Sequence, residues 1–201
     1  MTNLEFSITW DYRCPFARNL CEHVLTGLEA GAPWDVTFEP FSLDQVHVAE
    51  GETDVWGRPD KAPGLLAMQA GIAVRDRFPG SFLAVHHALF AARHEHGLDL
   101  RSPEVIRETL AGAGADADAV MAEVDGGAPL ETFRKAHERA VADHQVFGVP
   151  TVIAAGNAAF IRVMRAPDGD ADLAVRTVER AVDLVAGWDD LNELKHTTLS
   201  R

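Results

Sequence analysis

The chain has 201 residues, with 18 Lys and Arg against 31 Asp and Glu, so its formal net charge is −13. That length is enough to bury one compact core, and the 47% hydrophobic and 24% charged residues are typical of a globular protein rather than a disordered one. An acidic chain without a cluster of Lys and Arg is poorly suited to bind phosphate groups. We therefore expect neither nucleic acid nor a membrane surface as a partner.

The number of cysteines and the N-terminal segment both bear on where in the cell the protein is located. Two cysteines do not make a disulfide scaffold, which favours a reducing environment. Residues 1–5 show neither the basic nor the apolar region of a secretory signal, and the uncharged stretch 145–161 contains glycine and proline and is too short to span a membrane. The sequence predicts a cytoplasmic protein.

Residues 1–62 have the pattern of a βαβ unit. Apolar residues alternate from Leu4 to Trp10, as in a strand, and recur every fourth residue from Phe16 to Leu28, as on one face of a helix. Alternation returns from Trp34 to Phe38 and predicts a second strand. The weakly patterned segment 46–61 is predicted to be a mobile loop.

The middle of the chain, residues 63–144, is predicted to be entirely helical. Glycine and proline interrupt the helical periodicity at several points and divide it into four or five helices. Ser102 and Asp116 stand where two of these helices would begin, because their short polar side chains can cap free backbone N–H groups.

The last part, residues 145–201, returns to strands and ends in a helix. Strands are predicted for Val149–Ala154 and Ala158–Met164, with a turn between them, and an amphipathic helix for Ala174–Val185. The order strand, helix, strand, helical segment, two strands, helix predicts an α/β fold.

Cys14 is the clearest candidate for chemistry, because it lies where the first strand ends and the first helix begins. Free N–H groups and the helix dipole stabilise negative charge there, and Arg13 and Arg18 would add to the effect. The sequence thus predicts a reactive thiolate that attacks disulfides or electrophiles. The alternative is an inert, buried cysteine, a common environment for this residue. Cys21 lies about 10.5 Å further along the helix axis, too far for a disulfide with Cys14, and is predicted to be core.

Two motifs together resemble the DsbA-like branch of the thioredoxin superfamily. Cys14-Pro15-Phe16-Ala17 stands where that branch has its Cys-X-X-Cys motif, and Gly148-Val149-Pro150-Thr151 stands where it has its cis-proline loop. The resemblance covers nearly the whole chain. It implies a thioredoxin fold with an all-helical insertion, divided into an N-terminal βαβ part (1–62), the insertion (63–144) and a C-terminal ββα part with a tail (145–201).

Two further segments are similar to one subgroup of that branch. Residues 82–98 look like the insertion helices of FrnE-like proteins and of the mycothiol-dependent oxidoreductases of actinobacteria, and the tail Asp190–Lys195 is similar to that of the mycothiol group. The chain resembles a monothiol variant, because Ala17 stands where the dithiol enzymes have their resolving cysteine.

The resemblance implies a thiol-dependent oxidoreductase in which Cys14 is the catalytic residue. The expected substrate-binding residues are Trp10, Arg13, Pro15, Phe16, Ala17, Val149, Pro150 and Thr151. Trp10 and Phe16, with Trp56, would form an apolar wall, Arg13 would hold a carboxylate, and the backbone of Val149 would hydrogen-bond to the incoming thiol.

A monothiol enzyme needs a second thiol from outside the chain to complete its cycle. We expect mycothiol or glutathione as that co-substrate, with no tightly bound cofactor, and a disulfide or an electrophile as the other small-molecule partner. Kappa-class glutathione transferases and hydroxychromene-carboxylate isomerases, which are related to this branch, are often dimers, so a homodimer is also compatible with the resemblance.

Two alternatives stay open at this stage. The missing second cysteine is also compatible with a transferase or isomerase similar to kappa-class glutathione transferases and hydroxychromene-carboxylate isomerases, in which a bound thiol does the chemistry. The second alternative is a non-catalytic binding protein that keeps the fold but has lost the thiol chemistry. No metal site is predicted, because the histidines of residues 86–144 are expected on exposed helix faces and lack the His-Glu-X-X-His arrangement.

Overall fold

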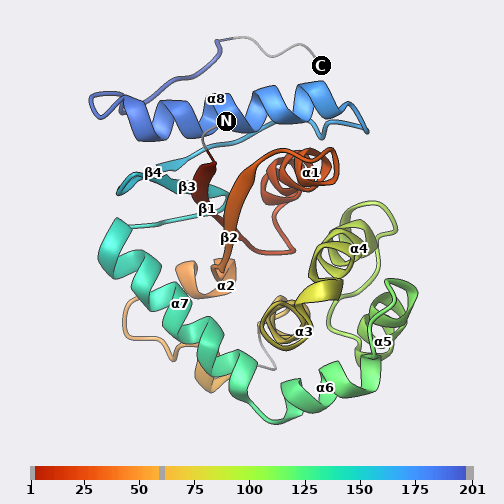
Figure 1. Cartoon of the computed structure of the whole chain (residues 1–201). Helices are drawn as coiled ribbons and strands as arrows, with labels where there is room; N and C mark the ends of the chain where they lie inside the picture. Colours follow the sequence, from red (N-terminus) through yellow and green to blue (C-terminus); the bar gives the residue numbers. More distant parts are fainter. Residues whose placement is uncertain (1–2, 59–61, 198–201) are drawn as a thin grey trace.

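The computed structural model describes residues 3–58 and 62–197, and Figure 1 shows their arrangement around one small sheet. The strand order is β2-β1-β3-β4. The strands are β1 (Leu4–Trp10), β2 (Trp34–Pro40), β3 (Thr151–Ala154) and β4 (Asn157–Phe160). β1 pairs in parallel with β2 and antiparallel with β3, which pairs antiparallel with β4. The predicted α/β fold is confirmed.

Two long helices pack against the sheet, one from the N-terminal part of the chain and one from the C-terminal part. α1 (Pro15–Glu29) contacts β1, and α8 (Ala171–Gly187) contacts β3 and β4, and the two helices pack against each other. In Figure 1 α8 lies along the top of the molecule with α1 directly beneath it. The first helix therefore starts at the end of the central strand β1, where Cys14 lies.

The helical segment forms the lower half of the molecule in Figure 1. Its described part contains five α-helices, within the predicted number of four or five: α3 (Leu65–Arg77), α4 (Phe82–His94), α5 (Pro103–Gly112), α6 (Ala117–Asp125) and α7 (Ala128–His144), with a short 3-10 turn η3 (Pro79–Ser81). α4 contacts α1, and α7 contacts β2. The side chains of Ser102 and Asp116 accept hydrogen bonds from the third following backbone N–H, which confirms both predicted helix starts.

Local differences from the sequence prediction occur at the ends of β3 and β4 and in the loop after β2. β3 starts at Thr151 rather than Val149, and β4 ends at Phe160 rather than Met164, because Thr151 and Phe160 are the last partners in the ladder between the two strands. Segment 46–61 was predicted to be a loop, but its described part contains η1 (Val55–Gly57), with Val55 buried in the core. Residues 59–61 lie outside the described residues.

A short helix, α2 (Leu43–Val46), precedes this segment and was not predicted. Ser42 caps it by accepting a hydrogen bond from the N–H of Gln45 at 3.1 Å. Four residues are too few to show a helical period in the sequence. α2 carries Asp44, which forms an ion pair with Arg13.

A cluster of aromatic rings joins the sheet to the helical segment. Its members are Trp10, Tyr12, Phe38, Phe82, His86 and Phe90, with ring centroids 4.9–6.5 Å apart and mostly edge-to-face. At its centre the Tyr12 hydroxyl and His86 Nδ1 share a hydrogen bond of 2.9 Å. Burial lowers the pKa of His86 to about 3, so this imidazole is neutral at physiological pH. The cluster fixes the end of β1 against α4, two residues before Cys14.

Within residues 3–58 and 62–197, no helix combines the length and the apolar composition that a membrane span requires.

Candidate active site

Cys14 is the N-cap residue of α1, immediately after β1. Its backbone is extended (φ −89°, ψ 117°), and its sulfur accepts a hydrogen bond from the N–H of Ala17 at 3.4 Å. The Cys14 thiol also donates to the carbonyl oxygen of Val149 at 3.2 Å. The two motifs singled out in the sequence, 135 residues apart, are thus in direct contact.

The loop before β3 is held against β1 by two buried hydrogen bonds. The N–H of Thr151 donates to Thr9 Oγ1 at 2.8 Å, and Thr151 Oγ1 donates to the carbonyl oxygen of Gly148 at 2.8 Å. The peptide between Val149 and Pro150 is cis. The two hydrogen bonds position the Val149 carbonyl opposite Cys14. Thr9 was not predicted as a site residue, because within its strand it looks like any other polar position of the alternation.

The charge state of Cys14 differs from the sequence prediction. Only 7% of its surface is exposed, and this burial raises the pKa of the thiol. The N–H groups of Ala17 and Phe16 lower the pKa, as expected at a helix N-terminus, but they do not outweigh burial. The prediction of a stabilised thiolate is therefore wrong for the resting protein: Cys14 rests as a neutral thiol that donates to Val149.

Asp11 is a buried carboxyl group that the sequence analysis did not identify. Its two oxygens accept hydrogen bonds from the N–H groups of Arg13 and Leu43, both at 2.9 Å. Burial raises the pKa of Asp11 to about 6, so the carboxylate is ionised at neutral pH. Its negative charge in turn raises the pKa of Cys14. An acidic residue shortly before a helix start, where side chains commonly bond to nearby N–H groups, is a signal that could have found it.

Arg13 does not point freely toward the thiol. Its guanidinium forms an ion pair with Asp44 of α2, and Asp44 also accepts a hydrogen bond from the N–H of Gly64 at 3.0 Å. Arg18, on the next turn, forms an ion pair with Glu95. Both arginines that the sequence placed beside Cys14 thus have carboxylate partners. Arg13 ties the active-site turn to α2 and to the start of α3.

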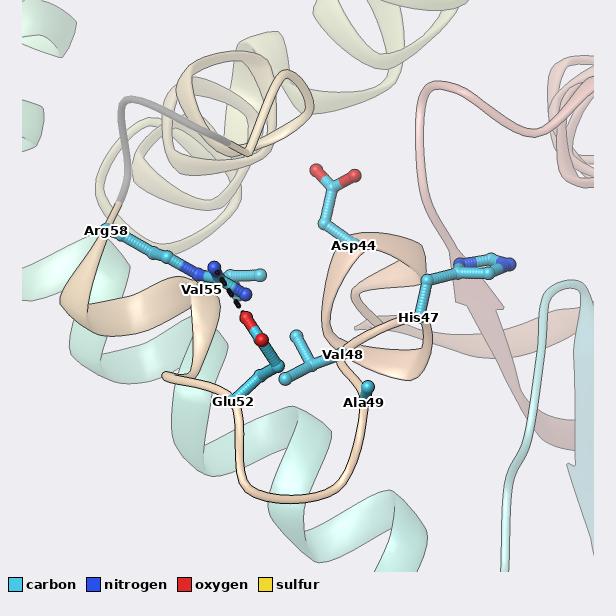
Figure 2. Close-up of a pocket in the computed structure, with 7 residues that line it drawn as sticks. All are labelled: Asp44, His47, Val48, Ala49, Glu52, Val55 and Arg58. Carbon is cyan, nitrogen blue, oxygen red and sulfur yellow. Dashed lines mark hydrogen bonds and ion pairs between the residues drawn. The ribbon is translucent and has the colours of Figure 1, made fainter.

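A cavity of about 300 Å³ lies against α2 and includes Asp44, the partner of Arg13, in its lining. Figure 2 shows its lining and the ion pair between Glu52 and Arg58, 3.3 Å. The lining residues are Asp44, His47, Val48, Ala49, Glu52, Val55 and Arg58. Cys14 is not among them, so this cavity is separate from the thiol.

The remaining predicted site residues fall into two groups. Phe16 is half-buried and Pro15 is exposed beside the thiol, whereas Ala17 is buried and contacts the sulfur through its backbone. Trp10, by contrast, has no exposed surface and lies within the aromatic cluster, so it offers no wall to a ligand in this structure. Trp56 packs on Phe133 and His137 of α7, away from the Cys14 motif.

Cys21 is completely buried and forms no disulfide, which confirms its prediction as a core residue. Burial raises its pKa well above the usual value, and the neighbouring Glu22 adds to the effect. It has neither a thiolate-stabilising contact nor access to a reagent.

Several histidines have structural partners rather than the exposed positions that the sequence predicts. His86 and His137 are buried, against Tyr12 and the backbone N–H of Ser42 respectively. The prediction of exposure is wrong for these two because each finds a hydrogen-bond partner on another element. In the described part of the chain, no three His, Cys, Asp or Glu side chains are grouped so as to hold a metal ion.

A helix-capping cysteine that donates to the carbonyl before a cis-proline, in an α/β fold with a helical insertion, defines a thioredoxin-like protein of the DsbA type. The chain belongs to the DSBA-like thioredoxin domain family, whose profile matches residues 7–170. Over 76 residues, 38% of this chain, it is 37% identical to a thiol:disulfide interchange protein DsbA of Azotobacter vinelandii and 36% identical to that of Pseudomonas aeruginosa. The aligned part spans only 35–36% of the length of these curated relatives.

Solved structures show the same architecture over most of the chain. Pseudomonas aeruginosa DsbA is 24% identical, with a TM-score of 0.55 over 89% of this chain and 85% of that one. A periplasmic thioredoxin-like protein from Salmonella enterica serovar Typhimurium is 19% identical, with a TM-score of 0.57 over 89% of this chain and 84% of the other. The thioredoxin-like fold with its helical insertion is thereby confirmed.

Proposed function

We propose that this protein is a monothiol oxidoreductase in which Cys14 exchanges with a disulfide and an external small thiol completes the cycle. The contact between the Cys14 thiol and the Val149 carbonyl is the observation that supports this most, because it brings together the two motifs of a thiol–disulfide exchange site. The presence of Ala17 in place of a second cysteine makes the site a monothiol one.

The proposed reaction has two balanced exchange steps. Cys14 loses its proton to solvent, and its thiolate attacks one sulfur of a disulfide, so that a new S–S bond forms and the other sulfur leaves as a thiolate that takes up a proton. A small thiol, as its thiolate, then attacks the substrate sulfur of the mixed disulfide and releases Cys14. The net result is a new disulfide and one released thiol, with no electrons gained or lost by the protein.

The residues around Cys14 have defined tasks in this scheme. The N–H groups of Ala17 and Phe16 stabilise the thiolate in both steps, in which Cys14 is first nucleophile and then leaving group. The backbone beside Val149 lies next to the sulfur and can pair with an extended segment of the substrate. Cys21 takes no part, because it is fully buried.

We further propose mycothiol or glutathione as the external thiol, a place in the subgroup of mycothiol-dependent and FrnE-like proteins, and a cytoplasmic location that would supply such a thiol. The similarity of residues 82–98 and 190–195 to that subgroup supports this assignment. Ala17 adds to it, since a mixed disulfide on Cys14 has no resolving partner within the motif.

The raised pKa of Cys14 also favours a second candidate, a transferase in which a bound thiol reacts and Cys14 only positions it. The oxidoreductase and the transferase hypotheses predict different activities for the variant Cys14→Ser. We would measure turnover of a small disulfide with glutathione and with mycothiol for the wild type, Cys14→Ser and Cys21→Ala. The oxidoreductase predicts a loss of about a thousandfold in Cys14→Ser and little change in Cys21→Ala. Substantial turnover in Cys14→Ser would instead establish the transferase.

A further inference from the structure

Arg162 lies just after β4, and its guanidinium is held over two aromatic rings beside the active-site turn. Its central carbon is 5.3 Å from the ring centre of Phe16 and 5.8 Å from that of Phe160. Phe16 is two residues after Cys14 in the first turn of α1. Cation–π contacts of this length hold an arginine in place while leaving its N–H donors free.

The aromatic platform continues toward the cis-proline loop. Phe160 also contacts Phe147 (ring centroids 5.3 Å apart), which is 68% exposed and lies two residues before Val149. The backbone of Gly148 packs on the edge of Phe160, since a Cβ at that glycine would lie 3.4 Å from the ring. Arg162 and these rings therefore connect the first turn of α1, through Phe16, with the loop before Pro150, through Phe147, and these are the two segments that meet at Cys14.

Arg162 differs from the other arginines near the thiol in having no carboxylate partner among the described residues. Arg13 pairs with Asp44 and Arg18 with Glu95, whereas the contacts of Arg162 within residues 3–58 and 62–197 are with two aromatic rings. Its positive charge also lowers the pKa of Cys14, although burial of the thiol outweighs this effect. In a protein of net charge −13, an exposed cation at this place is available to an anionic ligand.

We propose that Arg162 is a specificity-determining residue, which binds the carboxylate of an anionic thiol or disulfide while the sulfur of that ligand reaches Cys14. The proposal rests on the function proposed for Cys14. The exposed faces of Phe147 and Phe160 would contact the apolar part of the same ligand, next to the carboxylate. By this criterion glutathione, which has free carboxylates, fits the subsite. Mycothiol, which has no carboxylate, does not, so of the two thiols proposed above Arg162 selects glutathione.

The test compares two alkylating reagents that differ mainly in charge, iodoacetate and iodoacetamide. The rate of Cys14 modification by each is followed by mass analysis of the Cys14 peptide in the full-length protein, at one pH and low salt. The ratio of the two rates removes any change in the thiolate fraction, because both reagents need the thiolate, and it reports the attraction of an anion alone.

Arg162→Gln is expected to lower the iodoacetate-to-iodoacetamide ratio about threefold to tenfold, because one nearby positive charge is lost. Arg162→Lys should restore most of the ratio. Arg176→Gln is the matched control, since it removes an arginine of α8 that forms no described contact with the site, and its ratio should equal that of the wild type. A ratio in Arg162→Gln equal to that of the wild type would overturn the proposal.

Salt provides a second readout on the same proteins. The ratio for the wild type divided by the ratio for Arg162→Gln should fall toward one as salt is added, since screening removes the attraction to Arg162. The rest of the acidic surface is common to both proteins and cancels in this quotient, so a quotient that does not change with salt would overturn the proposal. If neither reagent modifies Cys14 in the native protein, the proposed function itself fails, which is a different result from an unchanged ratio.

Discussion

One cysteine caps the start of α1 and another lies in its second turn, and the two have different surroundings. Cys14 is 7% exposed and Cys21 is fully buried, and burial raises the pKa of both. Cys14, however, caps the helix and receives the N–H of Ala17, whereas Cys21 lies in the core among residues that only raise its pKa further. A candidate nucleophile therefore differs from an inert thiol in two respects. It accepts a hydrogen bond from a free N–H group at a helix N-terminus, and part of its surface is exposed.

Placing a second cysteine in the first turn should change the chemistry most. Ala17→Cys would put a thiol three residues after Cys14, at a Cα separation of about 5 Å in a helix, within the range for a disulfide. We expect an internal disulfide to form on oxidation and the lifetime of a mixed disulfide on Cys14 to fall about a hundredfold or more, because resolution becomes intramolecular.

Mass analysis after a brief reaction with a small disulfide measures this lifetime. Ala17→Ser is the control and should leave the mixed disulfide as long-lived as in the wild type. Persistence of the mixed disulfide in Ala17→Cys would mean that the geometry of the first turn is not that of a dithiol site.

The rates of alkylation of Cys14 and Cys21 directly test whether the two cysteines differ in accessibility and reactivity. We expect iodoacetamide to modify Cys14 and to modify Cys21 at least about a hundredfold more slowly, because Cys21 becomes accessible only when α1 opens or the protein unfolds. Denaturant should bring the two rates together. Equal rates in the native protein would show that the second turn is not the closed environment described above.

The loop opposite the first turn depends on Thr9. Thr9→Val keeps the shape of the side chain but leaves the N–H of Thr151 buried without its acceptor, so we expect the free energy of unfolding to fall by about 1–3 kcal/mol. Thr177→Val on the exposed side of α8 is the control, and a change within about 0.5 kcal/mol is expected there. Urea unfolding of the wild type, Thr9→Val and Thr177→Val measures the free energy of unfolding of each protein. Equal stability of Thr9→Val and the wild type would mean that this hydrogen bond does not hold the loop.

Asp11 should have the smallest but most specific effect on the first turn. Its pKa is raised from 3.8 to about 6, so it is negative above about pH 6 and raises the pKa of Cys14. Asp11→Asn removes that charge. The midpoint of Cys14 alkylation against pH should therefore move to lower pH, and the rate at pH 7 should rise. Asp183→Asn, an exposed change of equal charge on α8, should leave the midpoint in place. A midpoint that rises in Asp11→Asn would reverse the sign assigned here.

The raised pKa of Asp11 also makes the free energy of unfolding depend on pH. A folded-state pKa above the usual value means that the folded protein holds this proton more tightly than the unfolded chain. The stabilisation is complete below about pH 4 and is lost as the pH rises through about 6. Burial of the neutral His86, with its pKa near 3, acts in the opposite direction, because protonation of the unfolded chain below about pH 6.5 opposes folding.

The parts of the site that the sequence could predict are those set by local pattern. The alternation of β1, the helical period of α1 and the proline before β3 are each contained in a few consecutive residues. They predict Cys14 at the junction of β1 and α1 and Val149 next to the proline, and the structure has the two residues in contact. The contacts that tune the site join distant segments and leave no local pattern. The Tyr12–His86 bond spans 74 positions, and Arg162 lies more than 140 positions after Phe16, one of the two rings that it contacts.

The error on the charge of Cys14 has the same origin. A helix N-terminus can be recognised in sequence, and its N–H groups do lower the pKa of this thiol. Burial of the thiol and the charge of Asp11 come from the tertiary structure, and together they outweigh the effect of these N–H groups. The paired states of Arg13 and Arg18 were equally invisible, because Asp44 and Glu95 belong to other helices or their ends.

The central claim is that Cys14 works alone and is released by a thiol from outside the chain. The most direct measurement is the mass of the Cys14 and Cys21 peptides after reaction with a small disulfide, before and after a reduced small thiol is added. We predict the mass of one attached thiol on Cys14, none on Cys21, and complete loss of that mass when the reduced thiol is added. A disulfide between Cys14 and Cys21, or an adduct on Cys14 that the added thiol does not remove, would contradict the account.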